Sequence, residues 1–154
     1  MAVTHVAYEV DDWGVGELWL DEADRVVWHE LPRPAQTAPR GTHRAVELLR
    51  RYFGGEEVSF DGVLLDLDYE TPFLDRCAHA LREIPRGEVV TYGELAALAG
   101  RPNAQRAAGS VCANNRFPLV VPCHRVVSAT GIGGYGASGV EVKRRLLRLE
   151  GVSL

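Results

Sequence analysis

The residues most able to do chemistry stand together at positions 122–125, in the order Pro-Cys-His-Arg and between two β-branched runs. A cysteine thiolate is a strong nucleophile, and a nearby cation or imidazole stabilises it or takes its proton. Cys123 has His124 beside it and Arg125 one residue further on. Pro122 lacks an N–H, so the segment cannot be a regular central strand. The pattern predicts a nucleophilic cysteine in a buried, extended segment.

Ionisation of the thiol would not be sufficient for catalysis. With an ordinary pKa near 8.5, about 3% of a thiol is ionised at neutral pH. Full ionisation would therefore lower the barrier by roughly 2 kcal/mol, so alkyl or acyl transfer also needs a base and a proton for the leaving group. Neighbouring side chains point apart in extended backbone, so we expect a water between Cys123 and His124. Glu150, on the last predicted helix, is the candidate that orients the imidazole.

The elements of the first half must form a small α+β unit. Apolar runs at 4–10 and on both sides of an Asp-Glu-Ala-Asp turn at 21–24 predict three strands, and 57–69 predicts more strand. A Pro-rich connection covers 31–42. Residues 43–55 predict a helix with one broad apolar face, ended by two glycines.

The second half is predicted to be mostly helical. Thr71 can cap a helix over 72–84, and residues 89–116 hold two short helices separated by Gly100-Arg101-Pro102, a helix-turn-helix spacing. A glycine-rich loop follows at 128–139. Residues 140–151 predict a final helix, whose cations are typical of a solvated helix face: Lys143, Arg144, Arg145 and Arg148.

Charge divides the chain in the same place. Residues 1–70 have a balance of −9, and residues 71–154 have a balance of +5, which suggests that only the second half meets a polyanion. Three cysteines without a CxxC pair indicate neither a disulfide framework nor a thiolate zinc site. No apolar run approaches the roughly 20 residues of a membrane span, and we expect a cytoplasmic protein.

With these motifs the chain resembles the O6-alkylguanine-DNA alkyltransferases, also called methylated-DNA–protein-cysteine methyltransferases. The resemblance covers residues 71–151 at nearly family spacing, and the N-terminal half fits more loosely. It lies in six stretches: IPRGEVVTYGELAALAG, QRAAG, the asparagine at 115, PCHRVV, GGYG and KRRLLRLEG.

The resemblance implies an α+β fold with two domains. Residues 1–69 would form an RNase H-like supporting domain, and residues 70–154 a mainly helical, winged-helix-like domain with the helix-turn-helix. The implied activity is suicidal DNA repair: an alkylated guanine, chiefly O6-methylguanine with O4-alkylthymine as a secondary candidate, is flipped out of duplex DNA and dealkylated by a cysteine. Some relatives bind zinc in the first domain, but residues 1–70 contain no cysteine, so we expect no metal and no cofactor.

The resemblance also assigns roles to residues. Cys123 would accept the alkyl group, His124 would take the thiol proton through a water, and Glu150 would orient His124. Tyr92 would help extrude the nucleotide and donate a proton toward guanine N3, and Asn115 would be a hinge between the recognition helix and the active-site segment. The implied DNA contacts, through the minor groove to a monomer, are Arg106, which fills the gap in the base stack, and Tyr92, Ala107, Gly109, Ser110 and Arg125. The implied pocket residues are Pro118, Val126, Tyr135 and Gly136.

Several departures and alternatives stay open at this point. Cys77-Ala78 replaces a usual Val-Trp pair, Leu74 replaces a Gln, and Arg116 replaces the proline after the hinge asparagine. Cys112, on the recognition helix, could be a spectator, a redox partner or a second alkylation site. The rival functions are a non-catalytic alkyltransferase-like protein that only binds lesions, although such proteins replace the cysteine, and an unrelated thiol hydrolase.

Overall fold

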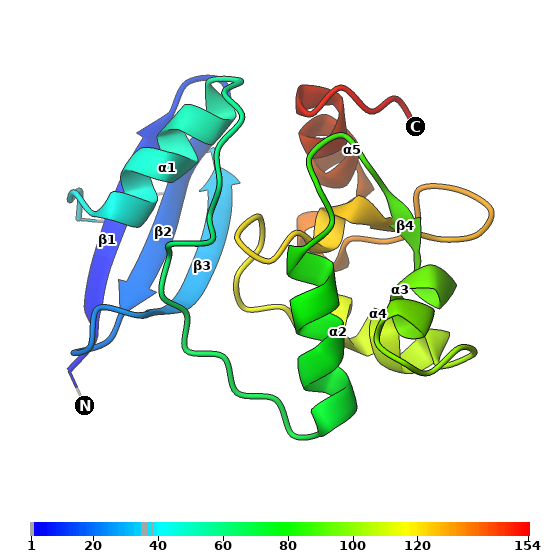
Figure 1. Cartoon of the computed structure of the whole chain (residues 1–154). Coiled ribbons are helices and arrows are strands. Elements are labelled where there is room, and N and C mark those ends of the chain that lie inside the picture. Colours follow the sequence, from blue (N-terminus) through cyan, green and yellow to red (C-terminus); the bar gives the residue numbers. More distant parts are fainter. Residues whose placement is uncertain (1, 35–36, 38) are drawn as a thin grey trace. The chain divides into compact units, whose positions relative to one another are not determined.

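The chain folds into two compact units in the computed structural model, which describes residues 2–34, 37 and 39–154 (Figure 1). The first unit comprises residues up to Leu67 together with Arg116–Val120, and the second comprises Asp68–Asn115 and Val121–Leu154. The Leu67/Asp68 division lies close to the expected boundary at 69/70. The short segment 116–120 nevertheless groups with the first unit, far from it in sequence.

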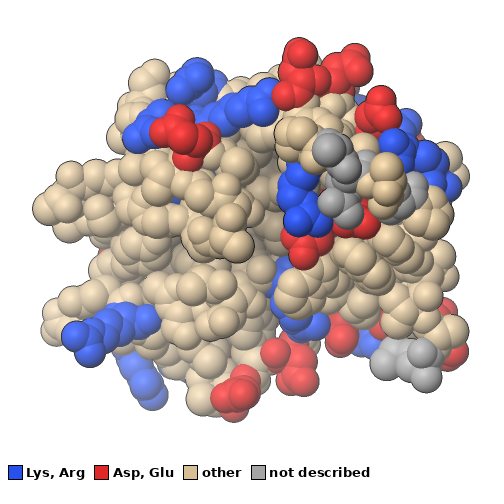
Figure 2. Space-filling model, turned by 180° about the vertical axis from the view of Figure 1, so that it is seen from behind, with Lys and Arg blue, Asp and Glu red and all other residues tan. Residues whose placement is uncertain are grey.

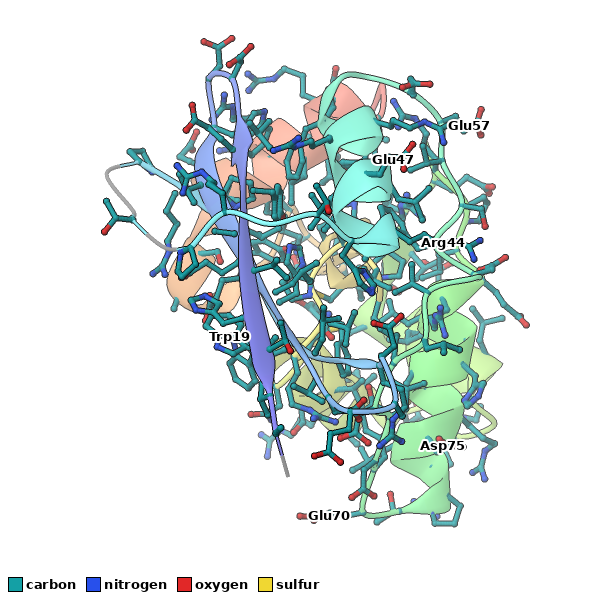
Figure 3. All side chains as sticks on the ribbon, turned by 90° about the vertical axis from the view of Figure 1, so that its left-hand side faces the viewer. Trp19, Arg44, Glu47, Glu57, Glu70 and Asp75 are labelled. Atoms are coloured by element: carbon teal, nitrogen blue, oxygen red, sulfur yellow. The ribbon has the colours of Figure 1, made fainter. Side chains whose placement is uncertain are left out.

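The first unit is built on a three-stranded antiparallel sheet in the order β1-β2-β3. The strands are β1 (Thr4–Val10), β2 (Gly14–Leu20) and β3 (Val26–Arg33), and helix α1 (Arg44–Phe53) lies along the sheet (Figure 1). Trp19 on β2, labelled in Figure 3, pairs with Trp28 and stacks on His5 with ring centroids 4.4 Å apart. Within the Pro-rich connection, residues 35, 36 and 38 lie outside the described part of the chain.

The strand predicted at 57–69 is wrong. This stretch makes one isolated parallel bridge, in which the Val26 N–H donates to Leu64 O and the Asp66 N–H donates to Val26 O. A turn interrupts the apolar run, because the Val63 N–H donates back to Phe60 O at 3.0 Å. After the turn, residues 64–69 find no further strand to pair with, in the part of the chain that the structure describes, beyond the bridge between Val26 and Leu65.

The second unit is mostly helical. Its helices are α2 (Pro72–Arg82), α3 (Tyr92–Leu98), α4 (Gln105–Ala113) and α5 (Val140–Leu149), with short 3-10 turns η1 (Cys123–Arg125) and η2 (Gly136–Ser138). Two short strands, β4 (Val90–Thr91) and β5 (Val126–Val127), pair in parallel through Val90 and Val126. Figure 1 shows α3 and α4 side by side, as the predicted helix-turn-helix requires. The predicted α+β class is confirmed.

Side-chain caps fix where α2 and α3 begin. Thr71 Oγ1 accepts from the Leu74 N–H, and Pro72 follows in the first turn. Thr91 and Glu94 form a reciprocal capping box that starts α3 at Tyr92. The Thr91–Glu94 capping box therefore places Tyr92 at the first position of α3. No helix in the described residues is long and apolar enough to cross a membrane.

Candidate active site

Cys123 is 6% exposed and opens the 3-10 turn η1. Pro122 has φ −81° and ψ 65°, the central conformation of an inverse γ-turn, and the Cys123 N–H accordingly donates to Val121 O at 2.8 Å. The prediction of an extended segment through residue 125 is therefore wrong. Successive side chains in a 3-10 helix are separated by about 120° rather than pointing to opposite faces. Extended backbone therefore gives no reason to expect a water between Cys123 and His124.

Asn115 connects the end of α4 to the sulfur. Its Nδ2 donates to Val121 O at 2.8 Å and to Cys123 Sγ at 3.1 Å. The same amide thus fixes the backbone before the cysteine and supplies a hydrogen bond that favours the thiolate. The structure brings Asn115 and Cys123 together as the hinge role requires.

His124 and Glu150 form a fully buried pair. His124 Nε2 lies 2.7 Å from Glu150 Oε2, and both side chains are 0% exposed. Since a carboxylate can only accept, Nε2 carries the proton and the other ring nitrogen, Nδ1, is left as an acceptor. Nδ1 is buried and has no hydrogen-bond partner among the described residues. A buried polar atom without a partner is uncommon and marks a place where water or a reactive group belongs.

Arg125 holds the carboxylate from the other side. Its Nε donates to Glu150 Oε1 at 2.8 Å, its Nη2 to Oε2 at 3.1 Å, and its Nη1 to Ile84 O at 2.7 Å. The predicted DNA contact of Arg125 does not fit this arrangement, because the guanidinium is engaged inside the unit. Arg125 instead orients the Glu150 carboxylate toward His124 through charge-assisted hydrogen bonds.

Burial controls the protonation of the central pair. Burial raises the pKa of the Cys123 thiol, while hydrogen bonds from Asn115 and Tyr135 and the charge of Lys143 oppose that rise. Burial also lowers the pKa of His124, against the opposing effect of Glu150. The resting site therefore holds a protonated thiol beside a neutral imidazole, which is the pairing that a general base needs.

Lys143 is the functional side chain that the sequence argument placed wrongly. It is 0% exposed rather than solvated, and its Nζ donates to Gly134 O at 3.0 Å. Burial lowers its pKa, and charges on Cys112 and Cys123 would raise it. Lys143, not Arg125, is thus the cation whose field reaches the Cys123 sulfur. The sequence did carry a signal, since Lys143 stands three and four residues before Leu146 and Leu147 on the apolar stripe of α5.

Tyr92 lies between the recognition helix and the glycine-rich loop. A methyl group at Gly109 would lie 3.8 Å from its Cδ1, and one at Gly133 would lie 3.5 Å from its Cε2 and 3.4 Å from Lys143 Nζ. Lys143 Nζ is 5.9 Å from the ring centroid. Gly133 has φ +76°, so both its conformation and its surroundings demand glycine. Burial raises the pKa of Tyr92, which keeps its hydroxyl protonated.

The remaining predicted pocket residues divide between the two units. Tyr135 has a buried hydroxyl whose hydrogen bond lowers the pKa of Cys123, Gly136 follows it at φ +53°, and Val126 is fully buried in β5. Pro118, in contrast, groups with the first unit, where its carbonyl accepts from His29 Nδ1 at 2.7 Å.

Four of the predicted DNA contacts lie on α4. Arg106 and Ser110 are exposed, and Ala107 and Gly109 between them are half-buried. The helix has no capping side chain and no acidic residue in its first turn, so its N-terminal N–H groups carry no competing anion. The face drawn in Figure 2 shows Lys and Arg in separate small groups among uncharged residues.

The other thiols do not form a metal site or a disulfide. Cys77, Cys112 and Cys123 are all free, and the described residues contain no cluster of His, Cys, Asp and Glu that could hold a metal ion. Burial raises the pKa of the Cys112 thiol well above its ordinary value. Such a thiol is almost entirely protonated at neutral pH and a poor nucleophile, which favours the spectator role among the three alternatives.

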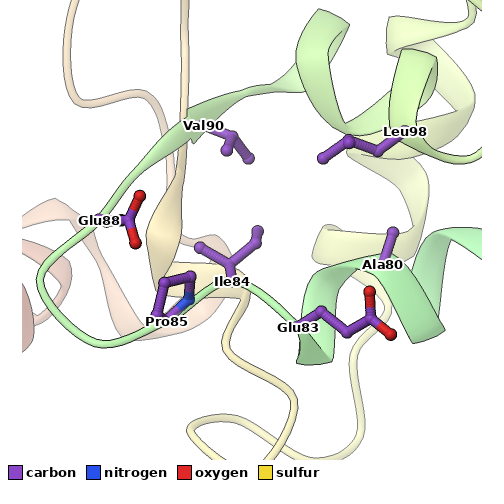
Figure 4. Close-up of a pocket in the computed structure, with 7 residues that line it drawn as sticks. All are labelled: Ala80, Glu83, Ile84, Pro85, Glu88, Val90 and Leu98. Atoms are coloured by element: carbon purple, nitrogen blue, oxygen red, sulfur yellow. The ribbon is translucent and has the colours of Figure 1, made fainter.

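An apolar pocket of about 270 Å³ in the second unit contains none of these groups (Figure 4). It lies between the end of α2 and the end of α3 and is lined by Ala80, Glu83, Ile84, Pro85, Glu88, Val90 and Leu98. Because no cysteine and no histidine lines it, it is not the site of the Cys123 chemistry.

Comparisons with known proteins show which family this chain is similar to. The family described as 6-O-methylguanine DNA methyltransferase, DNA binding domain, matches residues 72–152. A methylated-DNA–protein-cysteine methyltransferase of Mycolicibacterium paratuberculosis is 38% identical over 94% of this chain and 92% of its own length. Another, from Methanothermobacter thermautotrophicus, is 40% identical over 75% of this chain, and the match spans 65% of that relative.

A solved structure extends the likeness to three dimensions. The O6-methylguanine methyltransferase of Mycobacterium tuberculosis superposes with a TM-score of 0.80 at 34% identity, covering 97% of this chain and 93% of that one. The same organism's protein, solved in complex with DNA, gives a TM-score of 0.78 at 35% identity, over 96% and 92% of the two chains. The chain therefore belongs to the methylated-DNA–protein-cysteine methyltransferases, the family that repairs O6-methylguanine in DNA by moving the methyl group to a cysteine of the protein itself.

Proposed function

We propose that Cys123 is the methyl acceptor and that His124 and Glu150 activate it. The observation that carries this proposal is the buried Nδ1 of His124, which has no hydrogen-bond partner in the described part of the chain, while Nε2 is bonded to Glu150. A neutral imidazole in this state can take a proton only at Nδ1. The thiol that needs deprotonation belongs to the preceding residue, and burial keeps that thiol protonated until a base removes the proton.

The transfer step balances on these groups. The thiol proton passes to His124 Nδ1 through a water, the bond from Sγ to the methyl carbon forms, and the bond from that carbon to guanine O6 breaks with its electron pair on the base. Tyr92, whose pKa burial raises, donates a proton toward N3 of the leaving guanine. The thioether is stable, so each molecule reacts once.

The methylated base must leave the duplex before the sulfur can reach it. Arg106 is exposed near the start of α4, and its side chain makes no hydrogen bond or ion pair with the described residues. We assign it to the gap that the flipped base leaves. Small residues at Ala107, Gly109 and Ser110 allow α4 to approach the minor groove closely. Tyr135 and Gly136 would then close over the base, with Val126 in the pocket floor, and one monomer would serve one lesion.

The decisive experiment is mass spectrometry after mixing the protein with duplex DNA that contains O6-methylguanine. We expect one methyl group per molecule, located on the peptide that carries Cys123. Cys123→Ala should form no adduct and still bind the lesion duplex. Binding without an adduct in the wild type would identify a non-catalytic lesion-binding protein, and the absence of both would favour an unrelated thiol hydrolase.

Arg106→Ala tests the flipping role separately. The variant should lose far more activity on methylated duplex than on free O6-benzylguanine, because only the duplex requires a base to be extruded. Lys and Ala variants of Arg101, an exposed arginine in the turn between the two helices, provide the control. Equal losses on the duplex and the free base would remove Arg106 from this role.

A further inference from the structure

The segment Arg116–Val120 belongs to the first unit, although the residues on both sides of it belong to the second. Asn115, just before it, and Val121, just after it, are hydrogen-bonded to each other, Nδ2 to O, at 2.8 Å. The segment is therefore a short excursion whose two ends meet beside the reactive cysteine. Anything that fixes its conformation also fixes where Val121 begins.

His29 on β3 holds this excursion at two points. Its backbone N–H donates to Arg116 O at 2.9 Å, and its Nδ1 donates to Pro118 O at 2.7 Å. The ring is only 2% exposed, and its Nε2 accepts from the Tyr8 hydroxyl at 2.6 Å. Both ring nitrogens are thus satisfied, so the orientation of His29 is fixed from two sides.

Arg116, which replaces the proline usual after the hinge asparagine, adds a third point. Its guanidinium donates to Asp66 O at 2.6 Å and to Val27 O at 3.4 Å, and lies 4.9 Å from the centroid of the Phe117 ring. Phe117 itself is 1% exposed. The Arg116 guanidinium therefore interacts with two backbone carbonyl groups and an aromatic ring of the first unit.

The held segment contains a strained residue. Leu119 has φ +74° and is 2% exposed. A bulky side chain disfavours this left-handed conformation, which persists only where the surroundings over-determine it. Here the fixed carbonyl of Pro118 lies directly before Leu119, and the Asn115-bound Val121 lies two residues after it.

We propose that His29 and Arg116 are positioning residues for Cys123, an inference that rests on the proposed role of that cysteine. They hold Arg116–Val120, including the left-handed turn at Leu119, so that the Val121 carbonyl meets Asn115. The same Asn115 amide donates to Cys123 Sγ at 3.1 Å. If Val121 is displaced, Asn115 loses the carbonyl that orients its amide, and the hydrogen bond that favours the thiolate weakens. The first unit is then part of the reactive machinery rather than a support.

The test uses the full chain and compares variants whose stability is measured first. His29→Asn removes the hydrogen bond to Pro118 O, and Arg116→Met removes the hydrogen bonds to Asp66 O and Val27 O. Tyr8→Phe removes the hydroxyl that donates to His29 Nε2. The control is His43→Ala, which removes the side-chain cap that accepts from the Ala45 N–H at the start of α1, in the same unit but outside the segment. Urea denaturation ranks the four variants by stability, and all rate measurements use conditions in which circular dichroism shows them folded.

Two readouts separate positioning from mere destabilisation. We expect His29→Asn and Arg116→Met to slow single-turnover methyl transfer by about tenfold or more and to move the pH midpoint of Cys123 alkylation by iodoacetamide upward. Tyr8→Phe should have a smaller effect of the same sign, and His43→Ala should change neither readout.

Wild-type rates and an unchanged alkylation midpoint in His29→Asn and Arg116→Met would overturn the inference and leave the proposed function standing. If His29→Asn does not fold, Arg116→Met decides, because Arg116 is only half-buried. A wild-type protein that forms no adduct at Cys123 would instead refute the proposed function itself. The outcomes of the two proposals are therefore distinguishable.

Discussion

The molecule contains two buried histidines, one in each unit, and they differ in the hydrogen bonds of their ring nitrogens. His29 uses both ring nitrogens, on Tyr8 and on Pro118. His124 uses one, on Glu150, and its other nitrogen is buried without a partner among the residues that the structure describes. Burial lowers the pKa of both imidazoles, that of His29 to about 4, so both are neutral under ordinary conditions.

This difference separates a structural imidazole from a reactive one. A fully bonded buried ring is a rigid connector, because any proton it gained would break an existing hydrogen bond. A ring with one free acceptor and a carboxylate on the opposite side can gain a proton at a defined atom. Burial and pKa alone would not distinguish the two residues, whereas the count of satisfied nitrogens does.

The largest effect should come from removing the reactive ring. His124→Gln keeps a donor toward Glu150 but lacks the basic nitrogen, and we expect methyl transfer to slow by about 10²- to 10⁴-fold. Single-turnover kinetics on O6-methylguanine duplex measures this loss. His29→Gln, measured in parallel at matched stability, should lose much less. Equal losses would show that both rings serve the reaction in the same way.

Acid should next reveal the structural ring through stability. The unfolded His29 binds a proton with a pKa near 6.5, while the folded ring resists protonation down to about 4 because it is buried. Its contribution is therefore fully present above pH 6.5 and is lost as the pH falls toward 4, a change of about 3 kcal/mol. Urea denaturation at several pH values measures it. His29→Asn should flatten the slope, and the remainder reports groups such as His124.

Glu150→Gln should weaken the reactive ring without removing it. The carboxylate raises the pKa of His124, so its loss makes Nδ1 a poorer base and leaves Arg125 without its anion. A hydrogen bond to a charged group contributes roughly 1.5–3 kcal/mol, so transfer should slow by about tenfold to a hundredfold. The pH dependence of the rate gives the test, with the acid limb expected at lower pH. An unchanged profile would contradict the role of Glu150.

The smallest expected effect concerns the buried cation. Lys143→Met removes a charge that lowers the pKa of Cys123, so that pKa should rise. Iodoacetamide alkylation as a function of pH measures the shift directly. Arg148→Met, on an exposed position of the same helix, is the matched control and should leave the thiol unchanged. If both variants behave alike, the field at the sulfur does not come from Lys143.

Local signals predicted most of the fold. Thr71 and Thr91 begin helices where their capping chemistry indicates, and the Gly100-Arg101-Pro102 turn separates α3 from α4 as expected. The strand predicted at 57–69 is wrong because apolar content does not reveal whether a partner strand is available. Only one bridge, between Val26 and Leu65, forms there.

The site was predictable where residue identity carries the chemistry and less so where burial decides it. Cys123 and Asn115 meet, and His124 and Glu150 meet, as the motifs indicate. The role of Arg125 depends on a carboxylate 25 residues away and on a distant carbonyl, which no local pattern contains. The hold of His29 on Pro118 spans 89 positions in the sequence. Such pairings are set by tertiary structure and can only be observed.

The membership of Arg116–Val120 in the first unit has a consequence for engineering. A fragment cut at Leu67/Asp68 would carry this stretch away from β3, exposing Phe117, Leu119 and Val120, each no more than 3% exposed in the intact chain. Transplanting the reactive half onto another scaffold would therefore require grafting a substitute strand with it. No single cut in the chain separates the two units, and a gene fusion must keep both pieces of each unit.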